Sequence, residues 1–398
     1  MKKLCTLLGA ISLSLLASAE ITGNGYYRVH NVGSDRYIYV LDDKGSLNMQ
    51  AQTAELGALQ LWKDIDKTIS DPATIIHVID LDGKQRDFDF QSQGTGVAKI
   101  LNHAVSVIKV GSNPIVYRIF GRDSGITKYI QDGTKNSKDR GYLTSQGEKA
   151  SDYMNWYFDE VKSTTDNYFG LTPEVELNGE YYATFFAEFP FTPASAGLKV
   201  YYVSQTSNHI LALKEITGTV PAKTPVVVKC NSENPADNKI ELGGSASAIS
   251  GNCLKGVYFD NPGERNGMHK NVTPWDKRYM RILGVTEKGK LGFVTAELEN
   301  IPRNRAYLPV TAAHHLEIQA LPEAEYFAGV DDKIADVANG LEFKVSGRTL
   351  TVGGGHAVQV YNIAGNEIYS GSDAEIQLPA PGIYFIRQGH HTAKFLCH

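Results

Sequence analysis

Two nearly identical stretches decide the fold of the first third of the chain, Tyr27-Arg28-Val29-His30 and Tyr117-Arg118-Ile119-Phe120. The first leads through a polar turn to Arg36-Tyr37-Ile38, and the second leads through another turn to Lys128-Tyr129-Ile130. Each stretch alternates its side chains with the period of two that is typical of a strand. The repetition predicts a module built from repeated pairs of strands.

A third, diverged copy of this pattern lies between the other two. It consists of Ile75–Leu81, the pair Asp82-Gly83 and the alternating stretch Arg86–Phe90. An Asp-Gly pair favours a two-residue type I′ turn, so we expect a tight hairpin here.

Strand patterns continue through the rest of the chain, and patterns with a helical period are nearly absent. The one short helix that we expect lies near Ala54–Trp62. The fold class predicted from the sequence is therefore all-β, built as a string of small modules. Further strands are expected at Tyr26–Val29, Val116–Phe120, Asn155–Val161, Leu198–Val203, Val226–Lys229, Val358–Ile363 and Ile383–Arg387.

The first module resembles the ricin-type β-trefoil, the fold of the R-type lectins. That family repeats three times a Tyr-x-Ile strand, a turn, a Tyr-Leu strand and a closing Gln-x-Trp motif. In this chain Leu61-Trp62 and Asn155-Trp156 stand where two closing motifs would lie, although neither is a true Gln-x-Trp. The resemblance covers residues 24–161. It implies a β-trefoil module over residues 20–165 that binds carbohydrate, with another small β-barrel as the alternative.

A sugar site needs an aromatic platform for the apolar sugar face and carboxylate or amide groups for the hydroxyls. Residues of these types lie beside the repeated strands. The alternative is that they are turn residues or aromatic side chains of the barrel interior. The candidates for ligand binding are Tyr39, Asp42, Asp43, Tyr142 and Asp152.

The N-terminus has the pattern of an export signal. Lys2 and Lys3 precede the apolar run Leu4–Leu16, and Ala17-Ser18-Ala19 is a small-residue cleavage site. The run is shorter than the roughly 20 residues of a membrane-spanning helix, so residues 1–19 are expected to be a signal peptide. The sequence shows no other segment apolar enough to span a membrane. We therefore expect a secreted protein.

Charge and cysteine content limit the partners. Removal of Lys2 and Lys3 leaves 37 of the 39 basic residues against 44 acidic ones, a net charge of −7, which argues against nucleic acid as a partner.

In an oxidising compartment Cys230 and Cys253 could form a disulfide, and two buried thiols are the alternative. Cys397 is then left over.

The second module, residues 172–320, is a row of short strands with prolines at their entries. Its phrases Val-Pro-Ala-Lys-Thr-Pro-Val, at residues 220–226, and Ala-Tyr-Leu-Pro, at residues 306–309, are similar to a β-sandwich module of secreted and cell-surface proteins in Bacteroidetes-type bacteria. That resemblance implies a location at the cell surface and no chemistry of its own. Polar runs at residues 163–167 and 321–340 are expected to be linkers.

The C-terminal module, residues 341–398, resembles the sorting domain of the type IX secretion system. It has the family's Tyr-Asn-aliphatic-x-Gly hairpin at residues 361–365, Leu378-Pro379, the strand Gly382-Ile383-Tyr384 and the final strand Lys394-Phe395-Leu396. This implies a small Greek-key sandwich that is read by an outer-membrane secretion machinery, and thus the outer surface of a Gram-negative bacterium. The alternative is a plain terminal β-sandwich.

Catalytic motifs are absent from the sequence. It has no His-Glu-x-x-His and no Gly-x-Ser-x-Gly, and the adjacent His314 and His315 would point to opposite faces of a strand. We therefore expect no enzyme, no cofactor and no metal. The predicted function is binding of carbohydrate through the first module. The alternatives are a structural or adhesive surface protein that binds proteins or cells, and a secreted hydrolase whose two carboxylates the spacing does not reveal.

Overall fold

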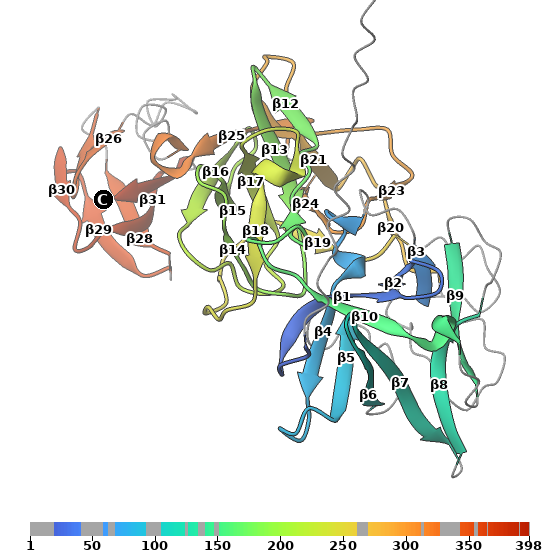
Figure 1. Cartoon of the computed structure of the whole chain (residues 1–398). Coiled ribbons are helices and arrows are strands. Elements are labelled where there is room, and N and C mark those ends of the chain that lie inside the picture. Colours follow the sequence, from blue (N-terminus) through green and yellow to red (C-terminus); the bar gives the residue numbers. More distant parts are fainter. Residues whose placement is uncertain are drawn as a thin grey trace, which may run out of the picture. The chain divides into compact units, whose positions relative to one another are not determined.

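The computed structural model shows an almost entirely β protein (Figure 1). Its described residues are 20–40, 59–62, 68–92, 105–123, 126–133, 140–146, 151–260, 270–311, 314–326, 343–353, 357–363, 365–389 and 391–397. The expected signal peptide, residues 1–19, lies outside them. The chain divides into two compact units, Met1–His209 with Glu215–Gln319, and Ile210–Lys214 with Ala320–His398.

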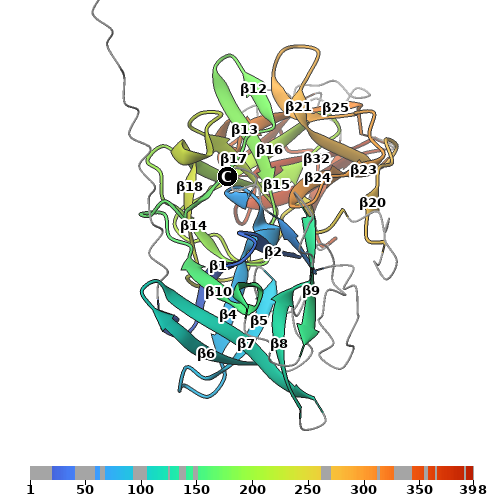
Figure 2. The same cartoon turned by 45° about the vertical axis from the view of Figure 1, so that its right-hand side comes forward.

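The first module is a closed ring of six antiparallel strands. Each strand pairs with its neighbour, and β1 pairs with both β4 and β10, which closes the ring. Figure 1 and Figure 2 show the ring from two sides. In ring order the strands are β1 (Gly25–Asn31), β4 (Ile76–Asp80), β5 (Asp87–Ser92), β6 (Val105–Ser112), β7 (Ile115–Asp123) and β10 (Trp156–Glu160).

The two repeated stretches have the same role in this ring. Tyr27 of β1 and Tyr117 of β7 are both buried in the core of the ring, together with Trp156 and Phe158 of β10. Tyr117 lies opposite Trp156 in the pairing of β7 with β10. The Trp156 indole donates a hydrogen bond to the Ile130 carbonyl at 3.0 Å, so the large ring is buried with its polar group satisfied.

Two hairpins extend from the ring. One consists of β2 (Tyr37–Val40) and β3 (Leu59–Trp62), and the other of β8 (Ile126–Asp132) and β9 (Arg140–Gln146). Strand β3 pairs with both β2 and β9. The expected helix near Ala54–Trp62 is therefore wrong over its last four residues, because a short apolar run fits either period and pairing on both sides favours the strand. Residues 54–58 lie outside the described residues.

The expected hairpin of β4 and β5 is present, but its turn is longer than two residues. Strand β4 ends at Asp80 and β5 begins at Asp87, which leaves the six residues 81–86 in the loop. The Asp80 carboxylate accepts hydrogen bonds from the amides of Gly83, at 3.0 Å, and Gln85, at 3.1 Å. These bonds replace the tight type I′ turn with a wider loop that is held by a side chain.

The middle module is built from runs of paired antiparallel strands. One has the order β11 (Phe169–Gly170), β18 (Lys239–Leu242) and β14 (Phe191–Pro193), and a short pair joins β20 (Thr273–Pro274) and β23 (Asn300–Ile301). A second run has the order β12 (Val175–Leu177), β13 (Glu180–Phe185), β17 (Val226–Cys230) and β15 (Lys199–Thr206). A third has the order β25 (Glu317–Pro322), β22 (Leu291–Val294), β21 (Met280–Val285), β24 (Arg305–Pro309) and β19 (Lys255–Val257). Strand β16 spans Ile210–Ile216. Short 3-10 turns of the described residues are η1 (Pro72–Thr74), η2 (Asp152–Met154) and η3 (Pro235–Asp237).

The first and middle modules share a hydrophobic core. Ile75, just before β4, is buried in the core cluster of the middle module together with Val161 and Phe169. The polar run at residues 163–167, expected to be a linker, packs against the ring, because the buried Asn167 amide donates to the carbonyls of Asp159 and Glu160. The two modules therefore belong to one compact unit.

The C-terminal unit is a small β-sandwich. Its two sheets have the orders β26-β27-β30 and β29-β28-β31-β32, and one hydrophobic cluster contains residues of both. Residues 327–340 of the expected linker lie outside the described residues. The strands are β26 (Phe343–Ser346), β27 (Thr349–Val352), β28 (Val358–Asn362), β29 (Glu367–Gly371), β30 (Glu375–Gln377), β31 (Gly382–Gln388) and β32 (His391–Cys397).

No cysteine of the described residues forms a disulfide in this structure, and Cys230 and Cys253 are both thiols. Cys230 is buried in the core of the middle module, and burial raises the pKa of its thiol to about 12. It fills core volume as a small apolar side chain.

Candidate functional site

The residues expected to bind sugar do not come together as a site. Asp42 and Asp43 lie outside the described residues, and of Tyr142 only the backbone is described, within β9 opposite Gln60. Asp152 is exposed in η2, where its carboxylate accepts a long hydrogen bond of 3.4 Å from the Asn155 amide.

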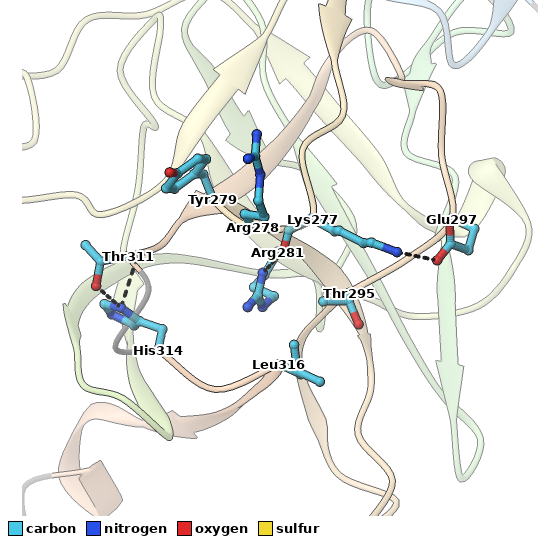
Figure 3. Close-up of a pocket in the computed structure, with 9 residues that line it drawn as sticks. All are labelled: Lys277, Arg278, Tyr279, Arg281, Thr295, Glu297, Thr311, His314 and Leu316. Atoms are coloured by element: carbon cyan, nitrogen blue, oxygen red, sulfur yellow. Dashed lines mark hydrogen bonds and ion pairs between the residues drawn. The ribbon is translucent and has the colours of Figure 1, made fainter.

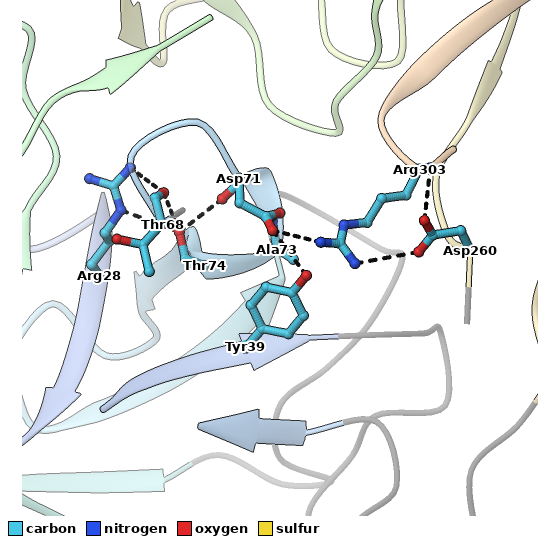
Figure 4. Close-up of polar contacts among 8 residues, drawn as sticks. All are labelled: Arg28, Tyr39, Thr68, Asp71, Ala73, Thr74, Asp260 and Arg303. Atoms are coloured by element: carbon cyan, nitrogen blue, oxygen red, sulfur yellow. Dashed lines mark hydrogen bonds and ion pairs between the residues drawn. The ribbon is translucent and has the colours of Figure 1, made fainter. Parts of the chain in front are cut away.

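Tyr39 is a buried contact between the first and middle modules (Figure 4). Its side chain is 6% exposed, and its hydroxyl donates to Asp71 at 2.9 Å. Arg303 donates to the same carboxylate at 2.8 Å, and its guanidinium carbon lies 5.0 Å from the centre of the Tyr39 ring. Arg303 also forms an ion pair with Asp260 at 3.4 Å. The ring of Tyr39 is thus used by the protein itself and leaves no platform for a sugar.

A second buried junction surrounds Arg28 of β1, which is 0% exposed. Its guanidinium donates to the carbonyls of Thr68, Ile69 and Tyr168 and to the side chain of Asn167 at 2.6 to 3.1 Å. Burial lowers the pKa of Arg28 to about 10. These contacts join both modules, so Arg28 is structural.

The middle module carries a hollow of about 610 Å³ (Figure 3). We call it the Arg281 hollow. It lies beside β21, and cationic, hydroxyl and apolar side chains surround it. The lining residues are Lys277, Arg278, Tyr279, Arg281, Thr295, Glu297, Thr311, His314 and Leu316.

Arg281 is the buried cation of this hollow, with 2% of its surface exposed. Carbonyl oxygens hold two of its nitrogens. Nε donates to His315 at 3.1 Å, while Nη1 donates to Lys277 at 2.6 Å and to Met280 at 2.7 Å. Within the described residues no carboxylate forms an ion pair with Arg281, and burial lowers its pKa. Nη2 forms no hydrogen bond with the described residues and can therefore donate to a ligand. A buried guanidinium that only neutral groups compensate favours an anion.

His314 provides a second donor. The backbone amide of Thr311 donates to its Nδ1 at 3.2 Å, and the Thr311 hydroxyl lies 2.9 Å from the same nitrogen. An amide N–H is always a donor, so Nδ1 accepts, and the neutral ring carries its proton on Nε2. His314 therefore presents an N–H group at Nε2 that donates to no acceptor among the described residues.

The other charged groups of the hollow are partly paired. Arg278 donates to Asp276 through Nε, at 3.0 Å, and through Nη2, at 2.8 Å, and Lys277 lies 3.4 Å from the exposed carboxylate of Glu297. Three cationic side chains and one carboxylate thus line a hollow on a chain whose net charge is −5. The hollow is a local positive region on an acidic protein.

Apolar surface accompanies this charge. Tyr279 and Leu316 are 53% and 66% exposed, although both are large hydrophobic side chains. The Arg278 guanidinium carbon lies 5.3 Å from the centre of the Tyr279 ring. Buried donors beside exposed apolar groups are the usual composition of a small-molecule site.

Sequence reasoning missed this site. The signal was the basic cluster at residues 277, 278 and 281, which stands out in an acidic chain. The sequence does not show that His314 and Leu316 join it, because this depends on β25 pairing with β22 and β22 pairing with β21. Among the described residues no group of three or more His, Cys, Asp and Glu side chains is arranged to hold a metal ion.

Comparison with known proteins adds no family. No protein-family model matches the chain, and no curated protein matches it at a significant level. No helix in the described part of the chain is long and apolar enough to cross a membrane.

Proposed function

We propose that this chain is a non-enzymatic binding protein that holds an anionic group of its ligand in the Arg281 hollow. The observation that carries the proposal is the Arg281 guanidinium, which is buried, fixed by three carbonyl oxygens and not paired with a carboxylate in the described residues. A positive charge that is buried without a counter-ion costs free energy, and a bound anion recovers it.

The place of action that fits this proposal is outside the cytoplasm. The predicted signal peptide at residues 1–19 and the sorting-like C-terminal module both favour secretion or display on the outer surface of a Gram-negative bacterium. Partners would then be glycans or surface proteins of the environment, together with the secretion machinery that reads the C-terminal module.

The test measures stabilisation of the full chain by inorganic sulfate, with chloride at equal ionic strength as the reference. We expect sulfate to raise the midpoint of thermal unfolding more in the wild-type protein than in Arg281→Met, because the general stabilisation by sulfate acts on both and only site binding depends on Arg281. The control variant Arg86→Met removes an exposed arginine of the first module and should behave as wild type. An equal shift in wild type and Arg281→Met would refute the proposal.

A second variant tests the proposal if Arg281→Met does not fold. His314→Ala removes the free Nε2 donor without touching the carbonyl anchor of Arg281. We expect it to weaken sulfate binding about tenfold, since one charge-assisted hydrogen bond contributes about 1.5 kcal/mol. Unchanged affinity in this variant would contradict the proposed geometry.

The second candidate function is carbohydrate binding by the first module. The observation that favours it is the closed six-stranded ring with flanking hairpins β2–β3 and β8–β9, because a β-trefoil is a six-stranded barrel that carries three such hairpins, and two hairpins are present among the described residues. A glycan array would test it with residues 20–319, which include the whole shared core. Hits that persist in Arg281→Met would support a sugar site in the first module, and a blank array would leave that module as a scaffold.

A further inference from the structure

Lys277 and Arg278 are exposed, so the buried donors of the Arg281 hollow are few, and this restricts how an anion can be held. Two of the three guanidinium nitrogens of Arg281 are already bound to carbonyl oxygens, so the fork that would grip an anion from two sides is not available. Among the described residues, Nη2 of Arg281, with its two N–H groups, and the Nε2–H of His314 form no hydrogen bond. One N–H from each of these two residues can meet one oxygen of a carboxylate.

The rest of the hollow suits a ligand that has hydroxyl groups. The Thr295 hydroxyl lies in the lining, and the Glu297 carboxylate stands at the hollow with 90% of its side chain exposed. A carboxylate at this position repels a negative group of the ligand, yet it accepts hydrogen bonds from hydroxyl groups.

The apolar groups complete the pattern. The exposed surfaces of Tyr279 and Leu316 lie in the lining of a hollow whose volume, about 610 Å³, is typical of small-ligand sites. A sugar ring has one face of C–H groups that packs on aromatic and aliphatic side chains, while its hydroxyl groups point to the edges. A carboxylate, hydroxyl groups and an apolar face occur together in an acidic sugar.

We infer that the Arg281 hollow binds a carboxylate-bearing sugar residue of an acidic polysaccharide. This inference rests on the proposed function, which requires only an anion. In this arrangement Arg281 and His314 hold the carboxylate, Glu297 and Thr295 receive the hydroxyl groups, and Tyr279 with Leu316 supports the ring face.

The experiment is calorimetric titration of the full chain with trigalacturonate, with its methyl ester, with an aspartate peptide of equal charge and with inorganic sulfate. We expect trigalacturonate to bind at least tenfold more tightly than the ester and the peptide. Arg281→Met should abolish the preference for the acid. Tyr279→Ala should weaken trigalacturonate binding about tenfold and leave sulfate binding unchanged.

The outcomes separate the inference from the proposed function. Sulfate binding that depends on Arg281, without saccharide binding, overturns the inference and leaves the proposed function intact. Tighter binding of the aspartate peptide assigns the hollow to an acidic protein and also overturns the inference. Equal affinity for the acid and its ester overturns it as well, because the carboxylate is then not recognised. Binding of none of the four probes overturns both.

Discussion

At the scale of single residues, two buried arginines show that the number of hydrogen bonds to the protein decides whether a guanidinium can also bind a ligand. Arg28 and Arg281 are both almost fully buried and both are held by backbone carbonyl oxygens. Arg28 donates through all three guanidinium nitrogens, so nothing remains for a ligand. Arg281 uses two nitrogens and lines a hollow, so it can act on another molecule.

The same contrast predicts the effect of Arg28→Met. The change removes the hydrogen bonds from Arg28 to the carbonyls of Thr68, Ile69 and Tyr168, and each hydrogen bond to a charged group contributes about 1.5 to 3 kcal/mol. We expect the free energy of unfolding to fall by about 3 kcal/mol or more, measured by urea denaturation. Arg86→Met should leave the urea midpoint unchanged, and an equally small effect of Arg28→Met would show that the junction is solvated.

At the scale of elements, strand β11 joins the two modules through a glycine. Gly170 pairs with Lys239 of β18, and its amide donates to the Ile69 carbonyl at 3.2 Å. A methyl group on Gly170 would overlap the backbone carbonyl of Pro235, which lies in a 3-10 turn beside the strand. The strand therefore has room only for glycine.

We expect Gly170→Ala to lower the free energy of unfolding by about 2 to 3 kcal/mol, because overpacking forces the backbone to move. The control is Gly83→Ala in the loop between β4 and β5. No atom crowds that position, and only its positive φ of 66° opposes a side chain, at a cost of about 1 kcal/mol. Guanidinium denaturation of both variants would compare the two costs, and equal values would argue against crowding at Gly170.

The sequence predicted the strands better than the contacts between residues of different strands. Strands such as β1, β7 and β31 follow from alternation alone, since their inward residues are aromatic or aliphatic. Tyr39 has the residue type of a sugar platform, but only the fold brings Arg303 onto its ring from 264 positions further along the chain. The Arg281 hollow was missed for the same reason, because its lining depends on which strands pair.

At the scale of the molecule, the ring and the middle module share one core. A fragment of residues 20–165 would expose Ile75 and would remove the Asn167 and Tyr168 partners of Arg28. We expect this fragment to bind a hydrophobic dye and to unfold without a sharp transition, whereas residues 20–319 unfold cooperatively. Hydrogen exchange on the full chain should give one opening free energy for amides of β10 and β17. A lower value in β10 alone would mean that the ring opens independently.

The closed ring also affects the tendency of this protein to aggregate at high concentration. Every strand of the ring has a partner on each side, because β1 joins β4 to β10. A sheet aggregates when a free edge offers its unpaired N–H and C=O groups to a foreign strand, and a closed ring offers no such edge. At high concentration the ring would therefore resist strand-by-strand aggregation for as long as the β1–β10 seam holds.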